Sequence, residues 1–387
     1  MKRSTDRILT THCGSLARPT ELLDLMKAKL NGQAYDQAAY AKRVTAAVAE
    51  VVREQAATGI DVVTDGEQGK PGFFTYVRER LTGYEAKPAP AGGWQQWAAE
   101  IADFPEYYEQ YLGKRMMGGS IAPRTPLLCT GPIKYQGQEA IRQDIANLKT
   151  AMAGQQVAEA FMPAVAPSGV EKNEYYKSDE EYLAAVGDAL REEYLAIVDA
   201  GFILQIDDPW LTEVHSQDPS LSAAARRKIA ERSVEAINHA ILGIPTEKIR
   251  FHTCYGINEG PRVHDAPLKE IVDLILKINA GAYLFEAANA RHEHEYHVWE
   301  TVKLPSGKIL IPGVITHCSN IVEHPELIAE RIVNFAKLVG RENVIAGADC
   351  GFSSQATYNP EVHPKVVWAK FAAMAEGARL ATKQLWR

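Results

Sequence analysis

Short apolar runs rich in β-branched residues recur along the whole chain, and each ends in polar residues. Such runs, bounded by polar or turn residues, are typical of buried strands. They lie at roughly residues 8–12, 60–66, 159–166, 202–207, 249–254, 282–287, 309–315 and 343–349. Longer segments with a helical period separate them, for example residues 179–200 and 221–242, and a last helix is expected from about residue 360 onward.

This alternation predicts the fold class. Strands that alternate with helices form a parallel sheet with helices outside it, and eight such units predict an α/β fold of the (β/α)8 TIM-barrel type. Barrels of this kind exceed 250 residues as one domain, so we expect a single domain over residues 1–387. Residues 84–135 interrupt the pattern after the second strand with a Pro- and Gly-rich stretch, an aromatic piece and an expected hairpin near Arg124. We expect this insertion to cover the barrel mouth or to form an arm of a homo-oligomer.

Composition and charge limit the classes of molecule that the protein is expected to bind. A formal net charge of −7 and a pI near 5.9 argue against nucleic-acid binding. The sequence contains no apolar stretch long enough for a membrane span, and its first residues lack the apolar region of a secretory signal. Five cysteines in a chain of this size suit a reducing compartment. We therefore expect a cytoplasmic protein that acts on small molecules.

Side chains that bind metals recur at the predicted strand ends. His252 and Cys254 end the fifth run, Glu286 the sixth and Cys350 the eighth, while His317 follows the seventh, so these positions recur every 31 to 33 residues. Because parallel strands present their carboxyl ends on one side, the side chains should converge there. One imidazole, two thiolates and a carboxylate form a suitable tetrahedral zinc site. The alternative is that buried Cys and His side chains only pack.

Other strand ends carry groups suited to an amino-acid ligand. Gly14 and Ser15 follow the first strand and offer close backbone approach and a hydroxyl. Glu67 follows the second strand and Asp207 ends the fourth, so two carboxylates should face the same mouth and suit an ammonium group. Helix or loop capping is the alternative for each acidic residue, and it is the preferred interpretation for Asp65.

These motifs together resemble the catalytic barrel of the cobalamin-independent methionine synthase family, over nearly the whole chain. In order they are Gly14-Ser15, Asp65-Gly66-Glu67, Gln205-Ile206-Asp207-Asp208-Pro209, His252-Thr253-Cys254, Glu286-Ala287, Ile315-Thr316-His317 and Asp349-Cys350-Gly351. The resemblance implies a zinc-dependent (Zn2+) methyl or alkyl transfer to a thiol such as homocysteine, from a donor such as a methylated folate. The zinc ligands that it implies are His252, Cys254, Glu286 and Cys350.

The resemblance also implies roles for the other strand-end residues. Glu67, Asp207 and the turn of Gly14 and Ser15 match positions that hold the amino-acid part of the thiol substrate. His12 and Arg18 flank that turn and are expected to join it. His317 matches a histidine implicated in proton transfer, and Asp207 is expected to take part in catalysis beside it.

The chain departs from the family pattern in three ways. It has room for one barrel where full-length members have two, it lacks the expected tryptophan after residue 168, and it has Asp207-Asp208 where the family has Asp-Glu. Residues 286–295 and 311–317 also resemble the epoxyalkane:coenzyme M transferases, in which a zinc-bound thiolate opens an epoxide. Arg18, Arg262 or Arg291 could then bind the sulfonate. A zinc- or thiol-binding protein without catalysis, and a metal-free decarboxylase of the related porphyrin-processing barrels, are the remaining alternatives.

The remaining histidines and cysteines are not expected to bind a metal. His292, His294 and His297 do not converge on one helix face, so we expect them at the substrate rim or on the surface. Cys13, Cys129 and Cys318 are expected to pack, with Cys318 near the site because it follows His317.

Overall fold

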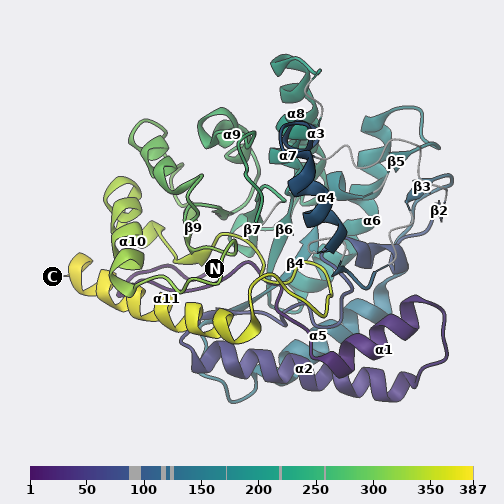
Figure 1. Ribbon diagram of the computed structural model, residues 1–387, viewed down its shortest axis with the longest axis horizontal. Helices are drawn as coiled ribbons and strands as arrows, with labels where there is room; N and C mark the ends of the chain where they lie inside the picture. The colour runs from purple at the N-terminus through teal and green to yellow at the C-terminus, as the bar shows by residue number, and fades with distance from the viewer. Residues whose placement is uncertain are drawn as a thin grey trace.

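A ring of parallel strands forms the centre of the protein (Figure 1). The structure is a computed structural model that describes residues 1–86, 97–114, 119–122, 126–170, 172–217, 220–256 and 259–386. Seven strands form the main sheet, and each pairs in parallel with its neighbours. In spatial order they are β1 (Val62–Val63), β4 (Glu159–Val165), β6 (Ile203–Asp207), β7 (Ile249–His252), β8 (Ala282–Phe285), β9 (Ile309–Ile315) and β10 (Gly347–Ala348).

The segment around Thr10 and Thr11 supplies the eighth strand position and closes the ring. Thr10 bridges in parallel to Ala346, beside β10, and Thr11 bridges in parallel to Val62 of β1. All eight predicted runs therefore lie in the barrel, and the predicted (β/α)8 fold is confirmed. The carboxyl ends of all eight consequently open on one side, where the candidate chemistry was expected.

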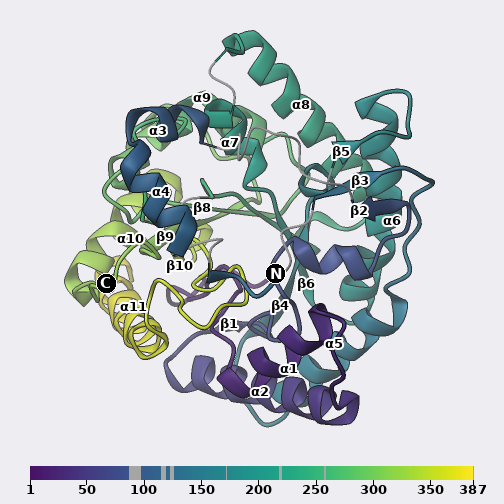
Figure 2. The ribbon, with the colours of Figure 1, turned by 45° about the vertical axis from the view of Figure 1, so that its right-hand side comes forward.

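Helices surround the ring (Figures 1 and 2). The longer ones are α1 (Thr20–Leu30), α2 (Gln37–Ala57), α5 (Gln138–Met152), α6 (Asp179–Asp199), α8 (Ala223–Ala240), α10 (Pro325–Val339) and α11 (Pro364–Leu385). The shorter α9 (Leu268–Ile275) and the 3-10 helix Glu293–Glu300 complete the crossovers. The predicted helices at 179–200, 221–242 and the C-terminus are thus α6, α8 and α11. Local sequence explains their starts, since the Ser178 side chain caps α6 and Pro364 opens α11.

The residues expected as an insertion form a small sheet and two helices. β2 (Tyr84–Ala86) pairs antiparallel with β3 (Leu127–Cys129), and β3 pairs in parallel with β5 (Lys172–Asn173). Arg124, around which a hairpin was expected, lies outside the described residues. The helices are α3 (Ala98–Asp103) and α4 (Pro105–Lys114), and they share an aromatic cluster of Trp97, Tyr108 and Tyr111.

These two helices lie on the side of the barrel where the strands end (Figure 2). α3 packs on α7 (Trp210–Gln217), which follows the carboxyl end of β6. The buried carboxylate of Glu100 in α3 accepts hydrogen bonds from the backbone N–H groups of Arg262 and His264, in the loop after β7, and from the Tyr108 hydroxyl. The insertion therefore anchors a loop of the barrel mouth. Among the described residues no helix is both long and apolar enough to cross a membrane.

Candidate functional site

Three thiols and one imidazole meet at the carboxyl ends of β7, β10 and the segment around residues 10–11, which is called strand one from here on and is distinct from β1. Cys13, Cys254 and Cys350 pack against one another, and each is at most 7% exposed. The Cys13 Sγ lies 3.2 Å from Nδ1 and 3.3 Å from Nε2 of His252. The ligand atoms of Cys13, His252 and Cys350 all lie within 4.8 Å of one another, and Cys254 joins them by packing against the other two cysteines.

The donor set of this cluster fits a thiophilic divalent metal such as zinc. Burial, together with the charges of Asp207 and Cys254, raises the pKa of Cys13 to about 12 against the lowering effect of a hydrogen bond with Cys350. The hydrogen bond with Cys13 is the largest influence on Cys350, whose pKa is raised to about 12. Such thiols stay protonated at neutral pH unless a cation compensates their charge, and a coordinated thiol is deprotonated outright.

Asp207 orients the imidazole of this cluster. Residues Asp207 of β6 and His252 of β7 are paired in the sheet, and the Asp207 Oδ1 lies 2.8 Å from His252 Nδ1. Burial alone would lower the pKa of His252, but its hydrogen bonds with Asp207, Cys254 and Cys350 raise it well above its ordinary value. A carboxylate on one ring nitrogen leaves the other nitrogen, Nε2, for a metal, which is the usual arrangement around metal-binding histidines.

Glu286, expected as the fourth ligand, belongs to a second cluster. Its carboxylate accepts from Tyr255 N at 3.1 Å and Asn289 Nδ2 at 2.7 Å, and it forms an ion pair with Arg262 Nη2 at 2.7 Å. Burial would raise the pKa of Glu286, but the charges of Arg262 and His317 lower it below its ordinary value. The structure thus brings together three of the four expected ligands and places Glu286 on an arginine.

The second cluster also contains His317. The ligand atoms of Glu286, His317 and Asp349 lie within 4.8 Å of one another, and all three residues are buried. Burial lowers the pKa of His317, against the opposing charges of Glu286 and Asp349. The Cys318 thiol lies 3.7 Å from His317 Nδ1, so Cys318 is near the site as expected. His317 therefore lies among the buried carboxylates of the second cluster, and burial favours its neutral form.

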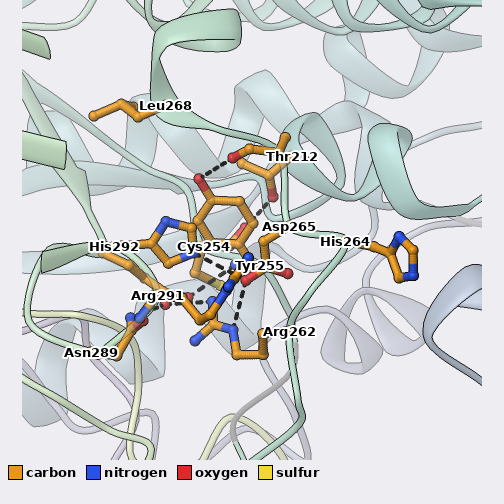
Figure 3. A network of polar contacts seen from close by, with 12 residues as sticks. Thr212, Cys254, Tyr255, Arg262, His264, Asp265, Leu268, Asn289, Arg291 and His292 are labelled. Atoms are coloured by element: carbon orange, nitrogen blue, oxygen red, sulfur yellow. Dashed lines mark hydrogen bonds and ion pairs between the residues drawn. The ribbon is translucent and has the colours of Figure 1, made fainter. Parts of the chain in front are cut away.

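A buried network of polar side chains supports Glu286 and Arg262 (Figure 3). Arg262 Nε lies 2.8 Å from Asp265 Oδ2, and the same carboxylate oxygen lies 3.0 Å from His292 Nε2. The His292 ring stacks on Tyr255 with centroids 4.1 Å apart and is 3% exposed. The surface position expected as one alternative for His292 was therefore wrong, because the side chain is buried with Asp265 and Glu295 at its two ring nitrogens. His294 and His297 are exposed, as expected.

Asp349 ties the two clusters together. Its carboxylate accepts from the backbone N–H groups of Ala287, Ala288 and Asn289, in the loop after β8. Asp349 immediately precedes Cys350, so these bonds connect the loop that bears Glu286 to the loop that bears a thiol of the first cluster. The sequence motif contains Asp349, but only the folded loops show this role.

The turn after strand one lies against Glu67. A Cβ atom at Gly14 would lie 2.8 Å from the Pro163 ring and 3.2 Å from Glu67 Oε1, and Gly14 has a φ of +140°. Only glycine therefore admits this approach. A Cβ at Gly351, next to Cys350, would lie 2.0 Å from Ser15 Oγ, so Ser15 borders the thiol cluster. Gly14 and Ser15 are both at the mouth, as expected.

Glu67 is a buried carboxylate with an unused oxygen. It is 2% exposed, and in the part of the chain that the structure describes no donor lies within hydrogen-bond distance of its Oε2. The nearest ion-pairing group is Arg18 Nη2 at 4.0 Å. Burial, together with the charges of Asp207 and Asp65, raises the pKa of Glu67 to about 7 against the opposing charges of Lys70 and Arg18. This oxygen is available to a cationic ligand.

The ring nitrogens of His12 and the two terminal nitrogens of Arg18 form hydrogen bonds within the protein. The His12 Nε2 lies 2.8 Å from Gln55 Oε1, and its Nδ1 accepts from Gly14 N. The Arg18 guanidinium donates to the backbone oxygens of Leu16, Ser353, Glu67 and Lys70. Both residues thus shape the turn that carries Gly14 and Ser15.

The fold and the site define a (β/α)8 barrel with a thiol- and imidazole-rich centre at its carboxyl-terminal mouth. The family model described as "Cobalamin-independent synthase, Catalytic domain" matches residues 165–374, more than half of the chain. The protein therefore belongs to the cobalamin-independent methionine synthase family, and the family resemblance inferred from the sequence motifs is confirmed.

Individual relatives agree with this assignment. A methionine synthase from Sulfolobus acidocaldarius is 24% identical over 378 residues, covering 97% of this chain and 93% of the relative. A 5-methyltetrahydropteroyltriglutamate–homocysteine methyltransferase from Streptomyces avermitilis is 26% identical over 89% of this chain but only 39% of its own length. Among solved structures, a B12-independent methionine synthase from Shewanella sp. W3-18-1 in complex with selenomethionine has the same fold, with a TM-score of 0.73, 19% identity, and coverage of 98% of this chain and 99% of that one.

Proposed function

We propose that this protein is a zinc-dependent methyltransferase that methylates a homocysteine-like thiol. The observation that carries the proposal is the cluster of His252 with three buried cysteines next to an unpartnered buried carboxylate, Glu67. The cluster can hold a metal that binds sulfur, and Glu67 can hold the ammonium group of an amino-acid thiol. The names of the relatives, which are methionine synthases, support the same reaction.

His252, Cys254 and Cys350 would hold the zinc. When bound, zinc would lower the pKa of a substrate thiol and keep it as a nucleophilic thiolate at neutral pH. Glu286 was expected as the fourth ligand, but it would first have to leave Arg262, Asn289 and the Tyr255 N–H.

The remaining residues would bind the substrate and move a proton. Glu67 and Asp207 carry the negative charges that an ammonium group requires, while Gly14 leaves room for the backbone of the turn to approach it. Asp207 has the additional task of orienting His252. His317 is buried beside Glu286 with a lowered pKa, so its neutral imidazole could accept the proton released by the substrate thiol and pass that proton to the leaving group of the methyl donor.

The epoxide-opening alternative receives less support from the cations of the site. Arg18 is committed to backbone oxygens, and Arg262 to Glu286 and Asp265. Arg291 is exposed and contacts the Val263 carbonyl. A sulfonate would also face Glu67 and Asp207, whose charges repel it.

Product analysis tests the proposal. We expect the zinc-loaded protein to form methionine from homocysteine and a methylated folate, as detected by mass spectrometry, and to lose this activity in a chelator until zinc is restored. Coenzyme M with a short epoxide serves as a parallel reaction. Thioether formation only in that reaction would replace the proposal by epoxide opening. If the protein binds homocysteine but forms no product with any methyl donor tested, the non-catalytic alternative would be correct.

A further inference from the structure

We propose that Cys13 is a ligand of the zinc centre, so that the protein without substrate holds the metal with Cys13, His252, Cys254 and Cys350. This inference rests on the proposed zinc dependence and adds a ligand that the sequence motifs did not indicate. Glu286 then stays with Arg262 in the absence of substrate.

The position of the Cys13 thiol is the first argument. Its sulfur lies within 3.3 Å of both ring nitrogens of His252, and the ligand atoms of Cys13, His252 and Cys350 form a set within 4.8 Å. The carboxylate of Glu286 is not part of that set and instead groups with His317 and Asp349. Cys254 joins the set by packing against Cys13 and Cys350. A metal placed among the three sulfurs and His252 therefore has Cys13 as a neighbour, while Glu286 belongs to the other cluster.

The second argument is that a buried network holds the backbone of Cys13 in place. Gln205 Nε2 donates to the Cys13 carbonyl oxygen and to Asp207 Oδ1, the same oxygen that contacts His252. The Arg250 guanidinium donates to Gln205 Oε1 and to the carbonyl oxygen of His12. One network therefore contains the carbonyl groups of His12 and Cys13 and the carboxylate of Asp207, which orients His252. Metal ligands are commonly supported by such contacts.

The third argument concerns Glu286 and the chemistry of the donors. One oxygen of Glu286 accepts from the Tyr255 N–H, and the other accepts from the Asn289 amide and forms an ion pair with Arg262. Binding a metal through Glu286 would break these contacts and leave the buried Arg262 with one carboxylate partner, Asp265, in place of two. Three thiolates and an imidazole carry the same formal charge as two thiolates, a carboxylate and an imidazole. The exchange of a carboxylate for a thiolate therefore leaves the total charge unchanged and gives zinc a ligand that it binds strongly.

Zinc X-ray absorption on the whole protein counts the sulfur ligands directly. Zn–S distances of ~2.3 Å separate from Zn–N and Zn–O distances of ~2.0–2.2 Å. We expect three sulfurs and one nitrogen in the substrate-free protein, two sulfurs in Cys13→Ala and in Cys13→Ser, and three in Glu286→Gln. Cys129→Ala is the matched control, because Cys129 is also a buried cysteine but lies in β3, outside the cluster, and it should keep three.

The outcomes separate this inference from the proposed function. Two sulfurs in the unmodified protein, or a sulfur number that Cys13→Ala leaves unchanged, would overturn the role of Cys13 while zinc dependence stands. Failure of the unmodified protein to bind zinc would overturn both. The number of sulfur ligands in the unmodified protein is measured without any variant. The inference can therefore be tested even if the Cys13→Ala protein folds poorly.

Discussion

Asp207 and Asp208 are adjacent carboxylates with different partners. Asp207 contacts His252 and Gln205, whereas Asp208 accepts from the Ser168 hydroxyl and from Leu211 N at the start of α7. The first therefore orients the imidazole of the thiol cluster, and the second caps the start of α7. The sequence motif pairs the two residues, and only their opposite directions from the end of β6 distinguish them.

Asp207→Ala should weaken zinc binding by roughly 10–100-fold, because the imidazole of His252 loses the group that orients it. A competition titration with a chromophoric chelator measures this affinity. Asp208→Ala is the control, since it removes the contact with Leu211 N and should lower stability while zinc affinity stays near the original value. Equal zinc affinity in both variants would remove the orienting role of Asp207.

Glu67 should make the binding of an amino-acid ligand depend on pH. Its pKa of about 7 means that the carboxyl group is largely neutral at pH 6 and ionised at pH 8, and only the ionised form attracts an ammonium group. Methionine is a suitable probe because it carries the ammonium group but no ionisable thiol. We expect its affinity to fall by about tenfold from pH 8 to pH 6, as measured by calorimetry.

Glu67→Gln supplies the control for this effect. The glutamine keeps the size of the side chain but cannot ionise, so the affinity should be weaker at pH 8 and nearly independent of pH. A pH dependence as steep as that of the unmodified protein would assign the titration to another group.

At the residue scale, the sequence predicted which kinds of side chain lie at the barrel mouth better than it predicted which of them contact one another. His252, Cys254 and Cys350 meet because their strands end at the same mouth. Cys13 was expected only to pack, although it also follows a strand that ends there. Glu286 does not join the thiol cluster because its carboxylate forms an ion pair with Arg262. Arg262 comes from another loop and has a φ of +59°. The ion-pair partner of a long side chain such as Glu286 depends on how the loops fold, which the sequence pattern does not show.

At the element scale, strand one depends on contacts from inside the barrel. Thr10 and Thr11 make single bridges to their neighbours, while Arg250 of β7 donates to the Thr11 hydroxyl and the His12 carbonyl. The guanidinium also lies 3.4 Å from the centre of the Phe161 ring. Burial lowers the pKa of Arg250 to about 9, against the raising charges of Cys13, Asp207 and Glu159. The eighth strand position is therefore held by a buried cation.

Arg250→Met should lower the free energy of unfolding by ~3 kcal/mol, because the change leaves Gln205 and two groups of strand one without their buried partner. Urea unfolding measures the loss. Arg227→Met serves as the control, since Arg227 pairs with Asp273 on the surface and contributes little. Equal effects of the two variants would show that the barrel interior does not depend on Arg250.

Helix α3 should protect the loop after β7. Glu100→Ala removes the acceptor for the amides of Arg262 and His264, so both amides should exchange hydrogen roughly tenfold faster. Hydrogen exchange followed by mass spectrometry reports this. Glu106→Ala, an exposed carboxylate of α4, should leave the exchange of these amides unchanged. Unchanged exchange in Glu100→Ala would mean that the loop keeps its order without the insertion.

At the scale of the whole molecule, hydrophobic periodicity was sufficient to predict the barrel. Eight runs with helices between them admit few arrangements, since parallel strands require right-handed crossovers. The route of residues 84–135 could not be predicted in the same way, because β3 pairs with both β2 and β5, which follows β4. Its strands have neither the length nor the alternation that would reveal such partners in the sequence.

The metal content of the purified protein tests the central claim most directly. We expect one zinc per chain by elemental analysis, and none in Cys254→Ser or Cys350→Ser, while Cys129→Ser keeps its zinc. A protein that retains no zinc when it is produced and purified with zinc present would contradict the claim. So would one equivalent of zinc in both ligand variants.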